Sequence, residues 1–317
     1  MLEFDLIQRY FTRATPGAEL GVGDDAALLR VGSGMELAVS TDMLVSGTHF
    51  LPDADPFLLG HKTLAVNLSD LAAMGAQPRW ATLALSLPQA DAAWLQKFSE
   101  GFFSLADQHG VELIGGDTTR GPLNLCVTIM GEVPRGAALR RSGAQPGDDI
   151  WISGELGDAA LALAHLQGKV QLSAADYSAC APALHQPVPR VALGLALRGV
   201  AHSAIDVSDG LLADLGHVLE SSQVGAEIQF NMLPVSERLR PYLAEAAGTH
   251  CALAGGDDYE LCFTSPVTRR SAVEALSKRL DLPLARIGAI VAGSGCIVRA
   301  ADSRVINIEE SGYDHFR

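Results

Sequence analysis

The chain reads Asp206-Val207-Ser208-Asp209-Gly210 at a junction that indicates its fold class. Residues 203–207 form a short apolar run typical of a buried strand, and residues 211–219 carry apolar side chains at helical spacing. A strand that passes through a glycine-containing turn directly into a helix is a common unit of mixed α and β folds. The stretch therefore predicts a strand, a turn with two aspartates, and a helix, in that order.

The same alternation of strands and helices extends outward through both halves of the chain, so we expect an α+β protein built of two α/β domains. Pro146-Gly147 is the expected boundary, which gives domains of 1–146 and 147–317. We predict a loop at 115–121. The predicted helices are 2–11, 55–74, 91–110, 190–198 and 211–219, and the predicted strands are 26–31, 36–40, 80–87, 111–114, 123–133, 149–153, 203–207, 227–230 and 261–264.

Length and composition exclude several classes of protein. The 317 residues suggest about two domains, and 48% hydrophobic residues are enough to form their cores. A net charge of −14 argues against general binding to nucleic acid or to an anionic membrane. No apolar run approaches the roughly 20 residues of a membrane span, and the first residues do not resemble a signal peptide. Five cysteines without CxxC spacing indicate reduced thiols, a cytoplasmic protein and no zinc site.

Aspartates recur in short segments rich in glycine, serine or threonine, each following an apolar run, and Asp70 lies near the end of a helical segment. Carboxylates are the ligands that magnesium prefers. If they converge, two charges about 4 Å apart repel by about 4 kcal/mol at an effective dielectric of about 20, so they require cations. Taken singly, each segment is more often only a turn. The segments are Gly23-Asp24-Asp25-Ala26, Ser40-Thr41-Asp42, Gly115-Gly116-Asp117-Thr118, Asp206-Val207-Ser208-Asp209-Gly210 and Gly255-Gly256-Asp257-Asp258.

Common nucleotide-binding and calcium-binding motifs are missing. Gly168-Lys169 is followed by Val170, so no P-loop is present, and neither H-R-D nor D-F-G occurs as in protein kinases. Residues 206–210 lack the oxygen spacing and closing glutamate of an EF-hand. Gly154-Glu155-Leu156-Gly157 could lie near a phosphate at the start of a helix, although a plain strand-to-helix turn is the commoner role of such a segment.

Together, in one order, these motifs resemble the thiamine-monophosphate kinases of the aminoimidazole-ribonucleotide-synthetase-like superfamily. The resemblance extends from Phe4 to Phe316. It implies two α/β domains of that type, with the N-terminal domain forming a homodimer and lining the ATP cleft. The motifs are Gly23-Asp24-Asp25-Ala26, Ser40-Thr41-Asp42 with His49-Phe50, the stretch from Asn67-Leu68-Ser69-Asp70 to Gly75, Gly115-Gly116-Asp117-Thr118-Thr119, Val207-Ser208-Asp209-Gly210, Gly255-Gly256-Asp257-Asp258-Tyr259-Glu260-Leu261 and Gly312-Tyr313-Asp314-His315-Phe316.

The resemblance also implies the reaction and the residues that serve it. The γ-phosphoryl group of ATP would pass directly to thiamine monophosphate, giving thiamine diphosphate, with several magnesium ions neutralising the phosphates. The acceptor phosphate is already ionised near neutral pH, so no general base is assigned. The implied magnesium ligands are Asp25, Ser40, Thr41, Asp42, Asp70, Asp117, Asp206 and Asp209; the ATP contacts are Gly116, Asp117, Arg141 and Ser208; the substrate contacts are His49, Asp257 and Tyr313.

From the sequence alone, other roles for three of these residues and other functions for the protein remain open. His49 also fits a structural histidine, Arg141 a solvated surface charge, and Tyr313 terminal packing. Another ATP-dependent enzyme of the superfamily is the first alternative. A selenophosphate synthetase would need a reactive residue near the N-terminus, whereas the first cysteine is Cys126. A purine-pathway synthetase and a non-catalytic metal- or nucleotide-binding regulator are the remaining alternatives.

Overall fold

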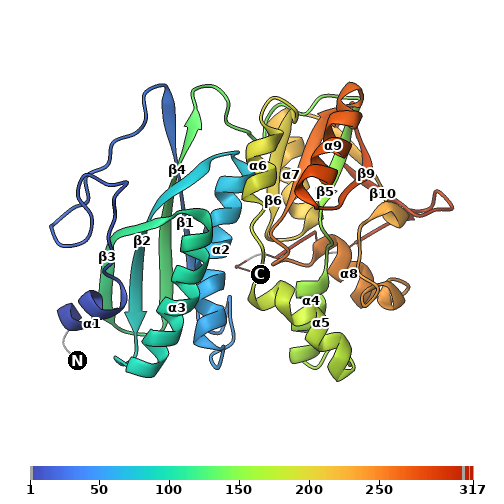
Figure 1. The fold of residues 1–317 in the computed structure, drawn as a ribbon. Coiled ribbons are helices and arrows are strands. Elements are labelled where there is room, and N and C mark those ends of the chain that lie inside the picture. The colour runs from blue at the N-terminus through green and yellow to red at the C-terminus, as the bar shows by residue number, and fades with distance from the viewer. Residues whose placement is uncertain (1–2, 309–310, 314, 317) are drawn as a thin grey trace. The chain divides into compact units, whose positions relative to one another are not determined.

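The computed structural model describes residues 3–308, 311–313 and 315–316 (Figure 1). Leu2, at the start of the first predicted helix, and Asp314, in the C-terminal motif, lie outside them. The chain divides into two compact units. The first runs through Leu71 and resumes over Ala76–Gly136, and the second contains Ala72–Gly75 and the chain from Ala137 onward. Among the described helices, none has the length and apolar character needed to cross a membrane.

The first unit is built on a four-stranded sheet with the order β1-β4-β2-β3. β4 pairs antiparallel with both β1 and β2, while β2 and β3 are parallel. Because β2 and β3 run the same way, their carboxyl ends meet at one edge of the sheet. The strands are β1 (Met35–Val45), β2 (Gln77–Leu87), β3 (Glu112–Arg120) and β4 (Asn124–Pro134).

Helices α2 (Pro56–Ala73) and α3 (Ala92–His109) cover one face of this sheet, as Figure 1 shows, and α1 (Glu3–Tyr10) lies near its β3 side. Two glycines allow α2 and α3 to approach closely. A Cβ atom on Gly60 would lie 2.9 Å from a backbone nitrogen of α3, and one on Gly101 would lie 2.8 Å from a backbone carbon of α2.

The predicted ends of α3 are confirmed. The carboxylate of Asp91 accepts hydrogen bonds from two N–H groups of the first turn, and Gly110 ends the helix with a left-handed φ of 64°. Asp55 caps α2 in the same way, by accepting from the N–H groups of Phe57 and Leu58.

The second unit contains a seven-stranded sheet with the order β11-β10-β7-β9-β5-β8-β6. Its pairs are antiparallel except for β7 and β10. The strands are β5 (Asp148–Ser153), β6 (Ser203–Val207), β7 (Gly225–Gln229), β8 (Glu260–Pro266), β9 (Leu284–Val291), β10 (Gly295–Arg299) and β11 (Val305–Ile306). The α-helices are α4 (Asp158–Leu166), α5 (Ala174–His185), α6 (Val191–Leu197), α7 (Leu211–Ser222), α8 (Ala246–Ala254) and α9 (Arg270–Leu280).

Both units mix helices and sheets, which confirms the predicted fold class, but three local predictions were wrong. The segment 115–121 is mostly strand, because β3 continues to Arg120 while paired with β2. Residues 40–42 lie inside β1, because pairing with β4 carries that strand to Val45. Residues 26–31 form no strand of their own, and Leu28 makes only an isolated bridge to Leu20. Pairing with neighbouring strands thus overrode the glycine and serine signals.

Candidate functional site

Ser40, Asp42 and Asp70 come together on the helix-covered face of the first unit. The Ser40 hydroxyl donates a hydrogen bond to the Asp70 carboxylate. The backbone N–H of Asp42 donates to Oδ1 of Asn67 at 3.2 Å. These contacts join β1 to α2 and place two carboxylates and one hydroxyl on the same side of the sheet.

Periodicity explains this convergence. Ser40 and Asp42 are two residues apart on a strand, so their side chains share a face. Asn67 and Asp70 are three apart on α2, so they share a face of that helix. Asn67 is only 1% exposed, and its amide N–H donates to the Thr63 carbonyl at 3.1 Å, which orients its oxygen toward β1.

Thr41 and Asp117 lie on the opposite face of the same sheet. The Thr41 hydroxyl is 2.8 Å from that of Thr128. Asp117 is paired with Ala84 in a row that continues to Met43 of β1, and paired residues point to one face. β1 and β3 are separated by two intervening strands, so Thr41 and Asp117 are at least roughly 14 Å apart, at about 4.8 Å per strand, and Thr41 lies two residues further along its strand. The first unit therefore does not bring them together, nor does it join them to Ser40, Asp42 and Asp70.

The glycine before Asp117 is required by close packing. Gly116 has a φ of 153°, and a Cβ atom there would lie 2.7 Å from the backbone carbon of Leu83. Asp25 lies in an exposed bend after Gly23, whose φ of 132° favours glycine. Asp25 is thus presented by a turn, as predicted, and Asp117 by a strand.

His49 has one ring nitrogen engaged by the backbone. Its Nδ1 accepts the N–H of Val45 at 3.0 Å. In the neutral ring the proton is therefore on Nε2, which is the donor atom. The ring is half-buried, so the backbone bond fixes both its tautomer and its orientation.

In the second unit, backbone hydrogen bonds gather four of the predicted residues. The N–H of Asp257 donates to the Ser208 carbonyl at 2.8 Å, and the N–H of Tyr313 donates to the Asp209 carbonyl at 3.0 Å. The N–H of Tyr259 adds a bond of 2.8 Å to the Val207 carbonyl. Residues predicted to contact ATP, metal and substrate thus lie on three adjoining segments.

The segment after Gly255 holds an uncommon backbone conformation. Asp257 and Tyr259 have φ angles of 69° and 51°, which are unfavourable for residues with side chains. The Tyr259 hydroxyl donates to the Asp257 carboxylate at 3.0 Å. At Gly256 a Cβ atom would lie 2.5 Å from the Ser208 carbonyl oxygen. The bonds to the neighbouring turn hold this conformation and aim the Asp257 carboxylate.

Two further carboxylates, Asp258 and Glu260, anchor the segment after Gly255 to other parts of the second unit. Asp258 accepts the N–H of Gly157 at 2.8 Å, and burial raises the pKa of Asp258 well above its usual range. Glu260 accepts hydrogen bonds from Ser153 and from Arg190, whose Nε is 2.7 Å away. Burial also raises the pKa of Glu260, while Arg190 opposes that rise. Because Asp258 occupies the Gly157 N–H, this group at the start of α4 is already satisfied.

The sequence reading missed Asp214, in the first turn of α7. Its Oδ2 accepts the N–H groups of Ser208, Asp209 and Gly210 at 2.9, 3.0 and 3.1 Å. Burial raises the pKa of Asp214 to about 7, although the three N–H groups oppose that rise. The sequence does contain a signal for this contact: Asp214 lies in the first turn of a helix, four residues after Gly210, where an acidic side chain can accept the unpaired N–H groups of the helix start.

Arg141 is exposed, but its backbone is held in place. The Ser222 hydroxyl donates to the Arg141 carbonyl at 3.2 Å and accepts the N–H groups of Gly143 and Ala144, each at 3.1 Å. Ser222 is the last residue of α7. This helix therefore contacts one predicted ATP-binding segment at its start and another at its end.

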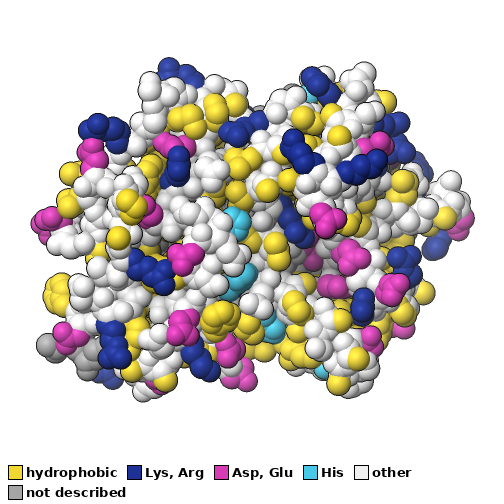
Figure 2. Space-filling model, in the orientation of Figure 1, with side chains coloured by type: hydrophobic (Ala, Val, Ile, Leu, Met, Phe, Trp, Pro, Cys, Tyr) yellow, Lys and Arg dark blue, Asp and Glu magenta, His cyan; other side chains and the backbone are white. Residues whose placement is uncertain are grey.

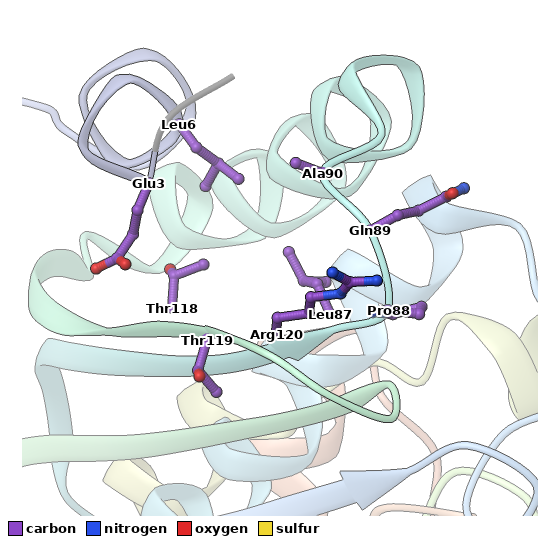
Figure 3. Close-up of a pocket in the computed structure, with 9 residues that line it drawn as sticks. All are labelled: Glu3, Leu6, Leu87, Pro88, Gln89, Ala90, Thr118, Thr119 and Arg120. Carbon is purple, nitrogen blue, oxygen red and sulfur yellow. The ribbon is translucent and has the colours of Figure 1, made fainter.

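A surface cavity of about 420 Å³ lies at the carboxyl ends of β2 and β3. Figure 3 shows Glu3 and Leu6 of α1 on one side and the strand residues on the other. None of the predicted site residues lines it, although Thr118 directly follows Asp117. The lining residues are Glu3, Leu6, Leu87, Pro88, Gln89, Ala90, Thr118, Thr119 and Arg120.

The donor atoms fit an oxygen-preferring cation. Ser40, Asp42 and Asp70 offer only hydroxyl and carboxylate oxygens, the ligands magnesium favours. Within the described part of the chain, no three or more His, Cys, Asp or Glu side chains form a group that could hold a metal. Magnesium is commonly held by one or two carboxylates together with phosphates and waters, so a protein-only cage is not required.

Charge on the visible surface is mixed. On the face drawn in Figure 2, acidic and basic side chains intermingle among the described residues, without a broad basic patch.

Comparison with known proteins gives matches over both halves of the chain. Residues 23–133 match the AIR synthase related protein N-terminal domain, and residues 145–300 match the corresponding C-terminal domain. Thiamine-monophosphate kinase of Escherichia coli K12 is 48% identical over 99% of this chain and 98% of its own length. The crystal structure of thiamine-monophosphate kinase from Stenotrophomonas maltophilia K279a is 52% identical, with a TM-score of 0.85 over 96% of each chain. AaThiL complexed with AMPPCP and TMP is 30% identical, with a TM-score of 0.79 over 99% of this chain and 96% of its own.

Proposed function

The chain belongs to the thiamine-monophosphate kinases of the AIR synthase related family, and we propose that it transfers the γ-phosphoryl group of ATP to thiamine monophosphate, forming thiamine diphosphate. The observation that carries this proposal is the meeting of three segments in the second unit. Ser208, Asp209, Asp257 and Tyr313 lie together there through backbone hydrogen bonds. Such a cluster fits a site that must hold two phosphorylated molecules.

ATP and thiamine monophosphate are the proposed substrates. A relative of 30% identity was solved with AMPPCP, an analogue of ATP, and with TMP. We assign the ATP contacts to Gly116, Asp117, Arg141 and Ser208. The exposed Arg141 side chain offers the planar cationic fork that suits phosphate oxygens, and Gly116, packed closely against Leu83 of β2, directly precedes Asp117.

The substrate contacts are assigned to His49, Asp257 and Tyr313. His49 presents Nε2–H as a donor, because its Nδ1 is engaged by Val45. Asp257 is aimed by Tyr259. Tyr313 is 52% exposed, which leaves its ring available to stack on an aromatic ring of the substrate rather than fill a core.

Magnesium ions complete the proposed site. When bound, they neutralise charge on the phosphate groups, which is the main requirement of phosphoryl transfer. Ser40, Asp42 and Asp70 already share one face, and the bond from Ser40 orients Asp70. The acceptor phosphate is ionised near neutral pH, so no side chain is needed to remove a proton. The full set of proposed magnesium ligands is Asp25, Ser40, Thr41, Asp42, Asp70, Asp117, Asp206 and Asp209.

We also propose that 1–146 acts as the ATP-binding, magnesium-binding and dimerisation domain and 147–317 as the second domain, in a cytoplasmic homodimer. The uncovered face of the first sheet supports the dimer, because Leu37, Val39 and Met43 on β1 are 40%, 56% and 55% exposed. Val39→Glu is expected to convert a dimer to a monomer in size-exclusion chromatography with light scattering. A wild-type monomer at micromolar concentration would refute this assembly.

The activity is tested with the purified protein, ATP, magnesium and thiamine monophosphate. Thiamine diphosphate and ADP are expected in equal amounts by chromatography. Formation of ADP with another acceptor, but not with thiamine monophosphate, would favour a different enzyme of the family. Binding of ATP without turnover of any acceptor would favour a regulator.

A further inference from the structure

Asp214 makes a set of contacts that its place in the helix alone does not require. One carboxylate oxygen accepts three successive backbone N–H groups, from Ser208, Asp209 and Gly210. The side chain is buried, since Asp214 is 4% exposed. A charged group is rarely buried unless its hydrogen bonds compensate for lost water. For Asp214 the hydrogen bonds that replace water come from the turn that contains the predicted site residues Ser208 and Asp209.

This turn is bounded by tight packing. Gly210 has a φ of 121°, and a Cβ atom there would lie 2.7 Å from the backbone of Ala254. On its other side the Ser208 carbonyl accepts the N–H of Asp257. The Ser208 N–H donates to Asp214 and the Ser208 carbonyl accepts from Asp257, so both polar groups of this backbone unit are held by neighbouring residues.

We propose that Asp214 is a positioning residue that fixes the Ser208-Asp209-Gly210 turn for binding magnesium and the nucleotide phosphates. The inference rests on the proposed function for the roles of Ser208 and Asp209. Asp214 does not touch the ligands. It acts by occupying the three N–H groups, so that the Asp209 carboxylate and the Ser208 hydroxyl are held in place before ATP arrives.

The test compares Asp214→Ala and Asp214→Asn with wild type in the full-length protein. Magnesium-dependent binding of AMPPCP is measured by calorimetry, and turnover is measured separately. Asp214→Ala is expected to raise the half-saturating magnesium concentration and to lower kcat/KM by about 100-fold, the loss typical of a displacement of about 1 Å. Asp214→Asn keeps an acceptor oxygen and is expected to recover part of both losses.

Hydrogen exchange supplies a readout besides activity. The amides of Ser208, Asp209 and Gly210 are expected to be protected in wild type and to exchange faster in both variants. If Asp214→Ala does not fold, Asp214→Asn decides: faster exchange of these amides with unchanged AMPPCP and magnesium binding would overturn the proposal. Equal losses in Asn and Ala variants would assign the effect to charge alone and would also overturn it.

Glu220→Ala is the matched control, because Glu220 is an exposed acid on the same helix. It removes the same charge and is expected to leave binding, turnover and exchange unchanged. The proposed function can fail separately. If wild type binds AMPPCP with magnesium but forms no thiamine diphosphate, the substrate assignment is wrong, while the binding and exchange measurements still test Asp214.

Discussion

In the first unit, Ser40, Asp42 and Asp70 face one another because strand and helix periodicity directs them to one surface, whereas in the second unit Ser208, Asp209 and Asp257 meet through bonds between the backbones of two turns. A set placed by periodicity tolerates a change in one side chain without moving the others. A set placed by backbone contacts depends on the residues that shape the turns. The first region should therefore be sensitive at its polar side chains, and the second also at its glycines and supporting residues.

The largest expected effect is the loss of a predicted ligand in the first unit. Asp42→Ala and Asp117→Ala should each lower kcat by about 100- to 1,000-fold, because each removes charge stabilisation of the phosphates. Asp53→Ala, at an exposed acid in the same unit, should retain activity. Steady-state kinetics, with circular dichroism to verify folding, measures the change. Near-normal turnover in both site variants would exclude these carboxylates from the mechanism.

The second expected effect is in the turn region and involves no charged group. Gly256→Ala would place a Cβ atom 2.5 Å from the Ser208 carbonyl, so either the turn shifts or the bond from Asp257 breaks. We expect about 1–3 kcal/mol lower unfolding free energy and a raised KM for thiamine monophosphate. Urea unfolding and initial rates measure the two quantities.

A matched glycine gives the opposite sign. At Gly216, inside α7, an added Cβ atom meets nothing within 4 Å. Gly216→Ala should therefore raise the unfolding free energy by about 0.5–1 kcal/mol, through helix propensity, and leave KM unchanged. Equal behaviour of the two alanine variants would contradict the idea that turn glycines define the second region.

The sequence predicted local features of the fold correctly but missed features set by residues that are distant in the chain. Helix ends with polar caps and glycines, such as Asp91 and Gly110, were predicted correctly because the signal lies in adjacent residues. The placement of Gly115-Gly116-Asp117 was wrong, because its strand conformation comes from pairing with β2, residues distant in sequence. The contact of Asp214 with the turn was missed for a related reason: a side chain that satisfies N–H groups several residues earlier has no distinct pattern of its own.

The candidate site was predictable as a set of residues but not as an arrangement. Asp42 and Thr41 are neighbours in sequence, yet the alternation of β1 sends their side chains to opposite faces. Nothing in the aspartate motifs distinguishes these two directions until the strand is recognised. Conversely, Asp257 and Tyr313 are far apart in sequence but both donate backbone hydrogen bonds to the turn at Ser208 and Asp209. The sequence motifs alone do not predict this proximity, because it depends on how the whole second unit folds.

A smaller effect is expected at the other end of α7. Ser222→Ala removes the bonds to the Arg141 carbonyl and to the Gly143 and Ala144 N–H groups. KM for ATP should rise several-fold, consistent with loss of about 1 kcal/mol of hydrogen bonding, while kcat changes little. Ser221→Ala, at the exposed neighbouring serine, is the control. A matching rise in both variants would show that Ser222 does not position Arg141.

The smallest effect on activity is expected at Asp149, a buried carboxylate that forms ion pairs with arginines of the protein itself. Asp149 on β5 is bound by Arg270 at 2.6 and 2.7 Å and by Arg286 at 3.4 Å. Burial alone would raise the pKa of Asp149, but the two arginines together hold it below its ordinary value of 3.8. Such a group stabilises the fold above its unfolded pKa, and this contribution is lost as the pH falls through the lower, folded pKa. No ligand is needed to balance this charge, in contrast to the two site regions.

Arg270→Ala should therefore lower the unfolding free energy at pH 6 without changing kcat, and its deficit relative to wild type should shrink as the pH falls below about 4. Urea unfolding at pH 6 and pH 3 measures this difference. Arg279→Ala, at an exposed arginine on the same helix, should show no such pH dependence. A deficit that stays constant between the two pH values would mean that Arg270 stabilises the fold through packing of its side chain, not through the charge of Asp149. The distinction between Asp149, whose charge is balanced by arginines of the protein, and the site carboxylates, whose charge is balanced by bound cations, would then be contradicted.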